Sequence, residues 1–151
     1  MGGQGPTEGR LAWPLERWRT IVREATEQCE RLWLPQLEPP CNALEWLGGT
    51  PQGLGLIATT RQADLPLLEA LLAHEVQPVP VDSASPHTIS LAIGPEGGWS
   101  ERELAAAQAA GWRAVSLGEA ILRTSTAAIA AVSRLAAWRQ LSCASCPSPS
   151  P

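Results

Sequence analysis

The chain of 151 residues has no lysine, no phenylalanine and no tyrosine, and only one methionine. Without lysine it cannot contain the G-x-x-x-x-G-K-[ST] phosphate loop. No apolar run approaches the roughly 20 residues that a membrane helix needs. The first ten residues also lack the basic and apolar regions of a secretory signal. We therefore expect a cytoplasmic protein with no membrane partner.

Basic charge is scarce as well, and the formal net charge is −4. Affinity for nucleic acids depends largely on cations that neutralise phosphates, so an acidic chain is a poor RNA binder by itself. Residues 100–140 are an exception, because they hold five arginines against three acids. A function on RNA would require a partner subunit, a further domain or these arginines.

Candidate metal ligands are few, with four cysteines and two histidines in the chain. Only Cys143 and Cys146 form a C-x-x-C pair, and a zinc site of this kind needs a second pair. The isolated histidines, His74 and His87, are expected in loops or on the surface. We expect no metal site.

The apolar residues of the chain occur in two kinds of pattern, which follow one another along the sequence. Steps of three and four predict helices, and short apolar runs predict buried strands. Helices are expected at 14–32, 63–75 (with Asp64 as its cap), 100–111 and 124–141, a short helix near 43–47, and strands at 54–60, 88–94 and 112–118. On the last helix, Ile129, Val132, Leu135 and Ala136 share one face. Prolines argue against a central strand over 76–87.

This alternation predicts an α/β fold with a mostly parallel sheet. Residues 1–13 and 142–151 are expected to be disordered, on either side of a domain at 14–141. Three strands are few for such a sheet, and no strand precedes the first helix. We therefore expect the domain to be truncated at its N-terminus.

The stretch "IGPEGGWSERE", residues 93–103, combines a strand end, three glycines and the capping-box pair Ser100 and Glu103. Ligands of open α/β sheets bind beyond the carboxyl ends of the strands. The loops expected there are "ATTR", "GPEGGWS" and "SLGEAILRTST". Glycine-rich turns are also common for purely structural reasons. Two such turns, the second followed by Arg123 and a Thr/Ser cluster, favour a ligand pocket.

Residues 93–103 resemble the turn I-G-P-E-G-G-[FW]-[ST]-x-x-E of the ribosomal RNA small subunit methyltransferase E family, 16S rRNA uridine-N3 methyltransferases of the SPOUT superfamily. A second family motif, L-G-x-R-I-L-R-x-E-T-A, is matched at Leu117, Gly118, Ile121, Leu122, Arg123, Thr126 and Ala127. The upstream segment at residues 16–40 is similar too. The resemblance covers about residues 15–141.

The resemblance implies a SPOUT-type sheet with helices on both faces and a C-terminal trefoil knot. It also implies S-adenosylmethionine as cofactor, 16S rRNA or the small ribosomal subunit as partner, and a homodimer. Family members carry an N-terminal basic RNA-binding barrel and about two further strands, so the resemblance implies that this chain is truncated or divergent. The residues expected to bind the cofactor are Thr59, Ile93, Gly94, Pro95, Glu96, Gly97, Gly98, Ser116, Leu117, Gly118, Ile121 and Leu122.

Arg123 is the expected catalytic residue, because a cation would stabilise the developing uridinate oxygen. The alternative role is a salt bridge to Glu96 or Glu119. We expect Glu96 to fix its turn through backbone N–H groups, with the orientation of a partner as the alternative. Trp99 is expected to pack within the domain, with stacking on a base as the alternative.

The chain departs from the second motif at Ala120, where the family has arginine, and at Ser125, where it has glutamate. Three hypotheses follow. The first is an S-adenosylmethionine-dependent 16S rRNA methyltransferase. The second is a non-catalytic remnant or accessory module that binds S-adenosylmethionine or a partner. The third is a SPOUT methyltransferase acting on tRNA ribose.

Overall fold

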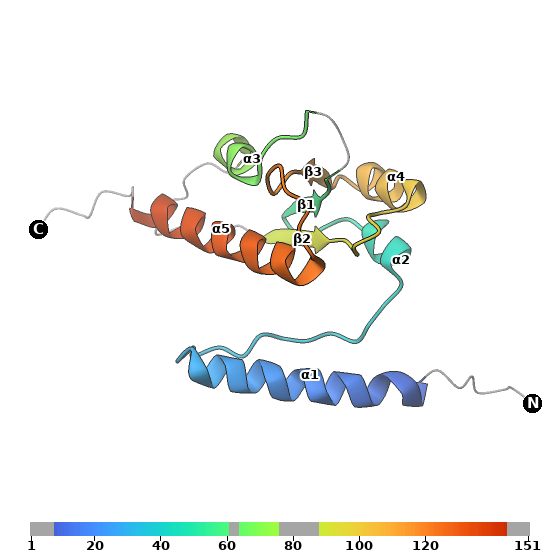
Figure 1. Ribbon diagram of the computed structural model, residues 1–151, viewed down its shortest axis with the longest axis vertical. Helices are drawn as coiled ribbons and strands as arrows, with labels where there is room; N and C mark the ends of the chain where they lie inside the picture. Colours follow the sequence, from blue (N-terminus) through green and yellow to red (C-terminus); the bar gives the residue numbers. More distant parts are fainter. Residues whose placement is uncertain (1–7, 61–63, 76–87, 145–151) are drawn as a thin grey trace, which may run out of the picture. The chain divides into compact units, whose positions relative to one another are not determined.

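The computed structural model describes residues 8–60, 64–75 and 88–144, and the chain divides into two units, Met1–Asn42 and Ala43–Pro151. The predicted order of helices and strands is confirmed (Figure 1). The elements are α1 Glu8–Gln28, α2 Ala43–Leu47, β1 Leu54–Ala58, α3 Leu68–Glu75, β2 Ile89–Ile93, α4 Glu101–Ala109, β3 Arg113–Val115 and α5 Thr124–Ala144. The proline-rich residues 76–87 lie outside the described ranges.

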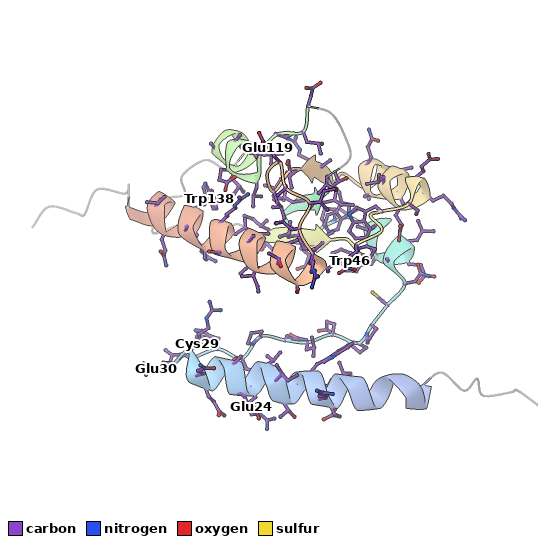
Figure 2. The ribbon with its side chains drawn as sticks, viewed as in Figure 1. Glu24, Cys29, Glu30, Trp46, Glu119 and Trp138 are labelled. Atoms are coloured by element: carbon purple, nitrogen blue, oxygen red, sulfur yellow. The ribbon has the colours of Figure 1, made fainter. Side chains whose placement is uncertain are left out.

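The first unit consists of α1 and the irregular segment that follows it. The helix begins at Glu8, earlier than the predicted start at residue 14. It ends in a Schellman motif, in which Arg31 N donates to Thr26 O (3.1 Å) and Glu30 N to Glu27 O (3.1 Å). Glu30 takes the left-handed position of this motif with φ 52°. The sequence does not signal this end, because glycine is the usual residue there; Cys29 and Glu30 mark it in Figure 2.

The second unit is built on a three-stranded sheet in the order β2-β1-β3, and all strand pairs are parallel. Ala58 at the end of β1 pairs in register with Ile93 at the end of β2. It also pairs with Val115 at the end of β3. The three strands therefore end at the same level, and the three loops that follow them start side by side.

Helices cover both faces of the sheet, as the strand alternation requires. Leu56 of β1 packs with α3, α5 and Val115, whereas the next residue, Ile57, packs with α2, α4 and Trp112 on the other face. Both side chains are almost fully buried, with 0% and 2% exposed. Helices on both faces of a parallel sheet are thus confirmed. The trefoil knot stays a prediction.

The face of α5 that packs in the core includes Leu135 from the predicted set but not Ile129 or Val132. Small residues, Ala127 and Ala131, are buried there, and Leu135 and Trp138 pack beside them. Trp138 is labelled on α5 in Figure 2. Ile129 and Val132 are 72% and 59% exposed. The helix is apolar on more than one side, so periodicity alone could not decide which face is buried. It also continues to Ala144, beyond the predicted end at residue 141.

The predicted start of α3 is wrong, and the predicted start of α4 is confirmed. Asp64 does not cap α3, which starts four residues later at Leu68; Asp64 has φ 61°. The capping box of Ser100 and Glu103 is present at the start of α4. Gly111, with φ 92°, follows its end. None of the helices in the described ranges has the length and apolar character needed to span a bilayer.

Candidate functional site

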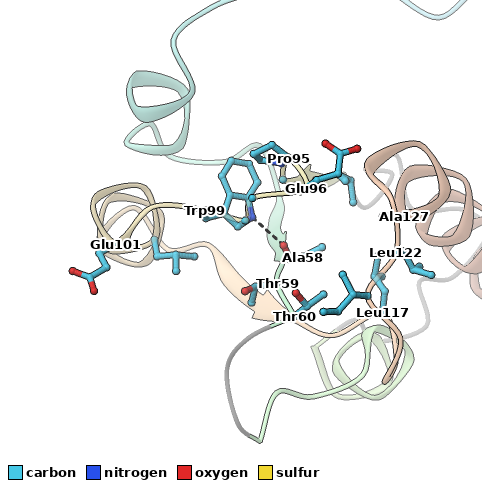
Figure 3. A pocket seen from close by; sticks show the side chains of 16 residues that line it. Ala58, Thr59, Thr60, Pro95, Glu96, Trp99, Glu101, Leu117, Leu122 and Ala127 are labelled. Atoms are coloured by element: carbon cyan, nitrogen blue, oxygen red, sulfur yellow. Dashed lines mark hydrogen bonds between the residues drawn. The ribbon is translucent and has the colours of Figure 1, made fainter.

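The three loops at the carboxyl ends of the strands enclose a pocket of about 400 Å³ (Figure 3). Small and apolar residues make up most of its lining. The lining residues are Ala58, Thr59, Thr60, Ile93, Gly94, Pro95, Glu96, Gly97, Gly98, Trp99, Glu101, Leu104, Leu117, Ile121, Leu122 and Ala127. The predicted meeting of the glycine corner (residues 94–98) with the β3–α5 loop (residues 116–123) is therefore confirmed.

The structure brings together all the predicted cofactor residues except Ser116 and Gly118, which flank the lining residue Leu117 without lining the pocket. Sequence reasoning missed several lining residues. Ala58 and Thr60 belong to the first loop, and Trp99 belongs to the glycine motif. The sequence signal for these two loops therefore covers all three residues. Ala127 belongs to the second family motif, although it lies on α5. Leu104 carried no comparable signal, because it lies within α4.

Trp99 forms one wall of the pocket and ties the glycine corner to β1. Its Nε1 donates to the main-chain oxygen of Ala58 at 2.9 Å (Figure 3). A Cβ on Gly94 would lie 3.0 Å from two atoms of the indole ring. The packing role expected for Trp99 therefore accounts for its position, and the close approach of the ring explains the glycine at 94.

The other two glycines of the corner differ from Gly94 and from each other. Gly98 has φ 79°, a left-handed conformation that L side chains rarely adopt. Gly97 lines the pocket, and a Cβ there would meet no atom within 4 Å. Neither backbone conformation nor packing within the described chain requires glycine at position 97. A ligand that approaches the main chain would require it.

Helix α5 also holds the glycine corner in place. Thr124, its first residue, donates from Oγ1 to the main-chain oxygen of Gly94 at 2.9 Å. Together with the Trp99 bond, this fixes the corner to both neighbouring loops. The end of β1, the end of β2 and the start of α5 thus form one bonded frame around the pocket.

The β3–α5 loop turns at Gly118, which has φ 116°. The hydroxyl of Ser116 donates to Gly118 O (3.2 Å) and accepts from Gly118 N (3.1 Å). From α5, Arg134 Nη1 donates to Leu117 O at 2.9 Å. Ser116 and Gly118 thus shape the turn from outside the pocket, which is why they do not line it.

Among the described residues that line the pocket, two glutamates carry charge, and none is an arginine or histidine. Glu101 points away from the other lining side chains in Figure 3, whereas Glu96 lies at the rim. The expected bonds from Glu96 to backbone N–H groups are absent. Its carboxylate has no hydrogen bond or ion pair with the described residues.

Arg123 lies at the end of the β3–α5 loop, exposed and outside the lining. Its side chain has no ion pair with Glu96, Glu119 or another described residue, so the salt-bridge alternative is not observed. Across the described ranges, no three His, Cys, Asp or Glu side chains are grouped as metal ligands would be.

A family model described as an RNA methyltransferase domain matches residues 5–136. The chain belongs to this family. The match includes α1, the sheet and both turns of the pocket, so the resemblance seen in the two motifs extends over most of the chain.

Relatives with defined names share this region. The ribosomal RNA small subunit methyltransferase E of Synechocystis is 42% identical over 124 residues, which are 80% of this chain and 38% of that protein. The protein of the same name from Mycobacterium bovis is 36% identical over 121 residues, 78% of this chain and 42% of that protein. The chain thus spans less than half the length of these two relatives.

Solved structures share the fold. A methyltransferase from Legionella pneumophila, solved with bound SAM, has a TM-score of 0.72 and 30% identity, over 89% of this chain and 50% of that chain. A ribosomal RNA small subunit methyltransferase E from Neisseria gonorrhoeae, bound to S-adenosyl methionine, has a TM-score of 0.63 and 33% identity, over 91% and 52%.

Proposed function

We propose that this chain binds S-adenosylmethionine in the pocket described above and forms part of an RNA methyltransferase that acts on N3 of a uridine in 16S rRNA. The observation that carries the proposal is the convergence of three strand-end loops on one pocket of about 400 Å³. Similar proteins are named as small subunit rRNA methyltransferases. The ribosomal substrate would place this activity in the cytoplasm.

The chemistry of the pocket fits this cofactor. Leu117, Ile121 and Leu122 offer an apolar wall for a flat base, and ligand pockets of roughly 300–1,000 Å³ are typical for molecules of this size. The single carboxylate at the rim, Glu96, has no counter-ion among the described residues. It therefore favours a cationic ligand such as a sulfonium over a phosphorylated nucleotide.

The cofactor, when bound, supplies a methyl group that is already activated on sulfur. The chain would then have to hold the target base and favour loss of its N3 proton. Arg123 is the proposed catalytic residue, because its guanidinium could stabilise negative charge on the uridine oxygen. Its exposed position beside the pocket loop leaves it accessible to a base that is extruded from RNA.

Calorimetry with S-adenosylmethionine tests the proposal, with Gly97→Ala as the informative variant. A methyl group at position 97 meets nothing within the chain, so the variant should unfold at the same temperature as the wild type. It should bind the cofactor about tenfold more weakly, which corresponds to roughly 1.4 kcal/mol.

The matched control is Ser133→Thr, which adds one methyl group at an exposed position of α5 that is outside the pocket. It should leave cofactor affinity unchanged. A folded wild-type chain that produces no binding heat at millimolar cofactor would refute the proposal.

A non-catalytic module is the second candidate, and the residues Ala120 and Ser125 favour it. They stand where the resembling family has arginine and glutamate, and both are exposed. Transfer of labelled methyl groups to unmodified small ribosomal subunits separates the two. Labelled 3-methyluridine would support the enzyme, whereas cofactor binding without any transfer would support the module. A labelled ribose in tRNA would instead support the third hypothesis.

We also propose that the chain forms a homodimer through the outer face of α5. Ile129 and Val132 are exposed there, and Leu141 is 70% exposed. An apolar surface of this kind is typical of interfaces. Val132→Asp should shift the mass measured by sedimentation from dimer to monomer. Gln108→Glu, at an exposed position of α4 on the other face of the sheet, is the control and should leave the mass unchanged.

A further inference from the structure

The side chain of Arg134 on α5 joins three segments of the second unit: α5 itself, α3 and the β3–α5 loop. Its Nη1 donates to the main-chain oxygen of Leu117 at 2.9 Å. Its Nε forms an ion pair with Glu69 Oε1 of α3 at 3.2 Å. Leu117 is 7% exposed, belongs to the core and lines the pocket. One guanidinium therefore joins α5 and α3 to the wall of the pocket.

The start of the β3–α5 loop is already held by the main chain. Ser116 N donates to Pro66 O at 2.9 Å, and Leu68 N donates to Ser116 O at 3.1 Å. Beyond Ser116 the loop has less support. Among the described residues, the Arg134 bond is the one hydrogen bond that joins residues 117–122 to a separate helix or strand.

The chemistry of arginine suits this task. Its guanidinium is planar and always charged, and it presents several N–H donors in a fixed fork. One nitrogen can hold a carbonyl while another holds a carboxylate, so the two partners are fixed relative to each other. Arg134 is about one third exposed. Its effect is therefore expected on the position of the loop more than on global stability.

We propose that Arg134 is a positioning residue for the pocket, which sets the place of the wall formed by Leu117, Ile121 and Leu122. This inference rests on the proposed function of the pocket as the S-adenosylmethionine site. It predicts that cofactor affinity depends on a side chain that does not touch the cofactor.

The test compares Arg134→Gln with Arg139→Gln on the same helix. Arg139 is exposed, and its side chain has no bond to a described residue. Calorimetry with S-adenosylmethionine should show about a tenfold loss of affinity for Arg134→Gln, the scale expected for a lost bond to a charged donor. Arg139→Gln should bind as the wild type does.

Two further variants separate positioning from a general structural role. Arg134→Lys keeps a charge but lacks the fork, so it should restore part of the affinity. Glu69→Gln keeps the bond to Leu117 and should lose less affinity than Arg134→Gln. If folded Arg134→Gln binds the cofactor as tightly as the wild type, the inference is wrong. Should Arg134→Gln not fold, wild-type affinity in both Arg134→Lys and Glu69→Gln would overturn it.

Hydrogen exchange without ligand keeps this inference separate from the proposed function. Amides of residues 117–122 should exchange faster in Arg134→Gln than in the wild type, while those of β1 should not change. Unchanged exchange in a folded variant would contradict the inference. A wild type that binds no S-adenosylmethionine would refute the proposed function, and the exchange result would still decide the role of Arg134.

Discussion

The glycine corner and the β3–α5 loop wall the same pocket, but the chain holds them in different ways. The corner is bonded to its neighbours at the pocket itself, by Trp99 to Ala58 O and by Thr124 to Gly94 O. The β3–α5 loop is bonded from behind, by Arg134 to Leu117 O. The corner should therefore be the rigid wall and the loop the wall that can be displaced.

The glycines in the two turns are required for different reasons. Gly94 makes room for the Trp99 ring, and Gly98 and Gly118 allow positive φ angles. Gly97 is required by neither condition. A glycine pattern in a sequence thus combines packing, conformational and ligand-binding requirements, and only coordinates separate them. Four changes test this comparison.

The largest loss of stability is expected for Gly94→Ala. The new methyl group would press on the indole of Trp99 and displace its bond to Ala58 O. Overpacking and a lost hydrogen bond together should lower the free energy of unfolding by about 3 kcal/mol. Urea denaturation followed by circular dichroism measures this. A loss no larger than that of Gly97→Ala would show that the corner is not packed as described.

Gly118→Ala should have the next largest effect, because alanine is strained at φ 116°. The expected cost is about 2 kcal/mol. The same denaturation experiment measures it, and Ala120→Ser, two residues later in the loop and exposed, serves as the control. Equal stability of the two variants would mean that the loop adopts another conformation at Gly118.

Trp99→Phe should lower stability by about 1 kcal/mol, since phenylalanine keeps the aromatic ring but cannot donate to Ala58 O. Trp46→Phe is the control, because Trp46 is 47% exposed and no bond from its ring nitrogen is observed among the described residues. If both variants are equally stable, the Trp99 bond does not hold the corner.

The smallest effect concerns Glu103, which follows the corner on α4. Its pKa is lowered from 4.5 because the Ser100 side chain and then the Ser100 backbone N–H bond to it. A lowered pKa stabilises the fold above pH 4.5 and loses this contribution as the pH falls through the folded value. Melting temperatures of the wild type and Glu103→Ala should therefore converge as the pH falls below the folded pKa of Glu103. A constant difference down to pH 2 would contradict this cause.

Much of this arrangement could be predicted from the sequence, because each local signal acts within a few residues. The strands, the capping box at Ser100 and the convergence of the two turns follow from periodicity and from the level ends of parallel strands. The start of α3 could not be predicted, because Pro66 O and Leu67 pair with Ser116 from the distant β3 region instead of starting a helix.

The buried face of α5 could not be predicted from the sequence for a related reason. A helix with apolar residues on several sides has two candidate faces for burial. The face that is buried against the sheet is the one with the small residues Ala127 and Ala131. The Arg134 bonds depend on α3, α5 and the loop meeting in space. No spacing in the sequence indicates such a meeting.

Hydrogen–deuterium exchange during titration with S-adenosylmethionine tests the central claim most directly, namely that both turns wall one cofactor site. We predict that amides of residues 94–98 and 117–122 gain protection together, at the same cofactor concentration, while those of α1 do not change. Protection of one turn alone, or protection confined to residues outside the pocket, would contradict the account.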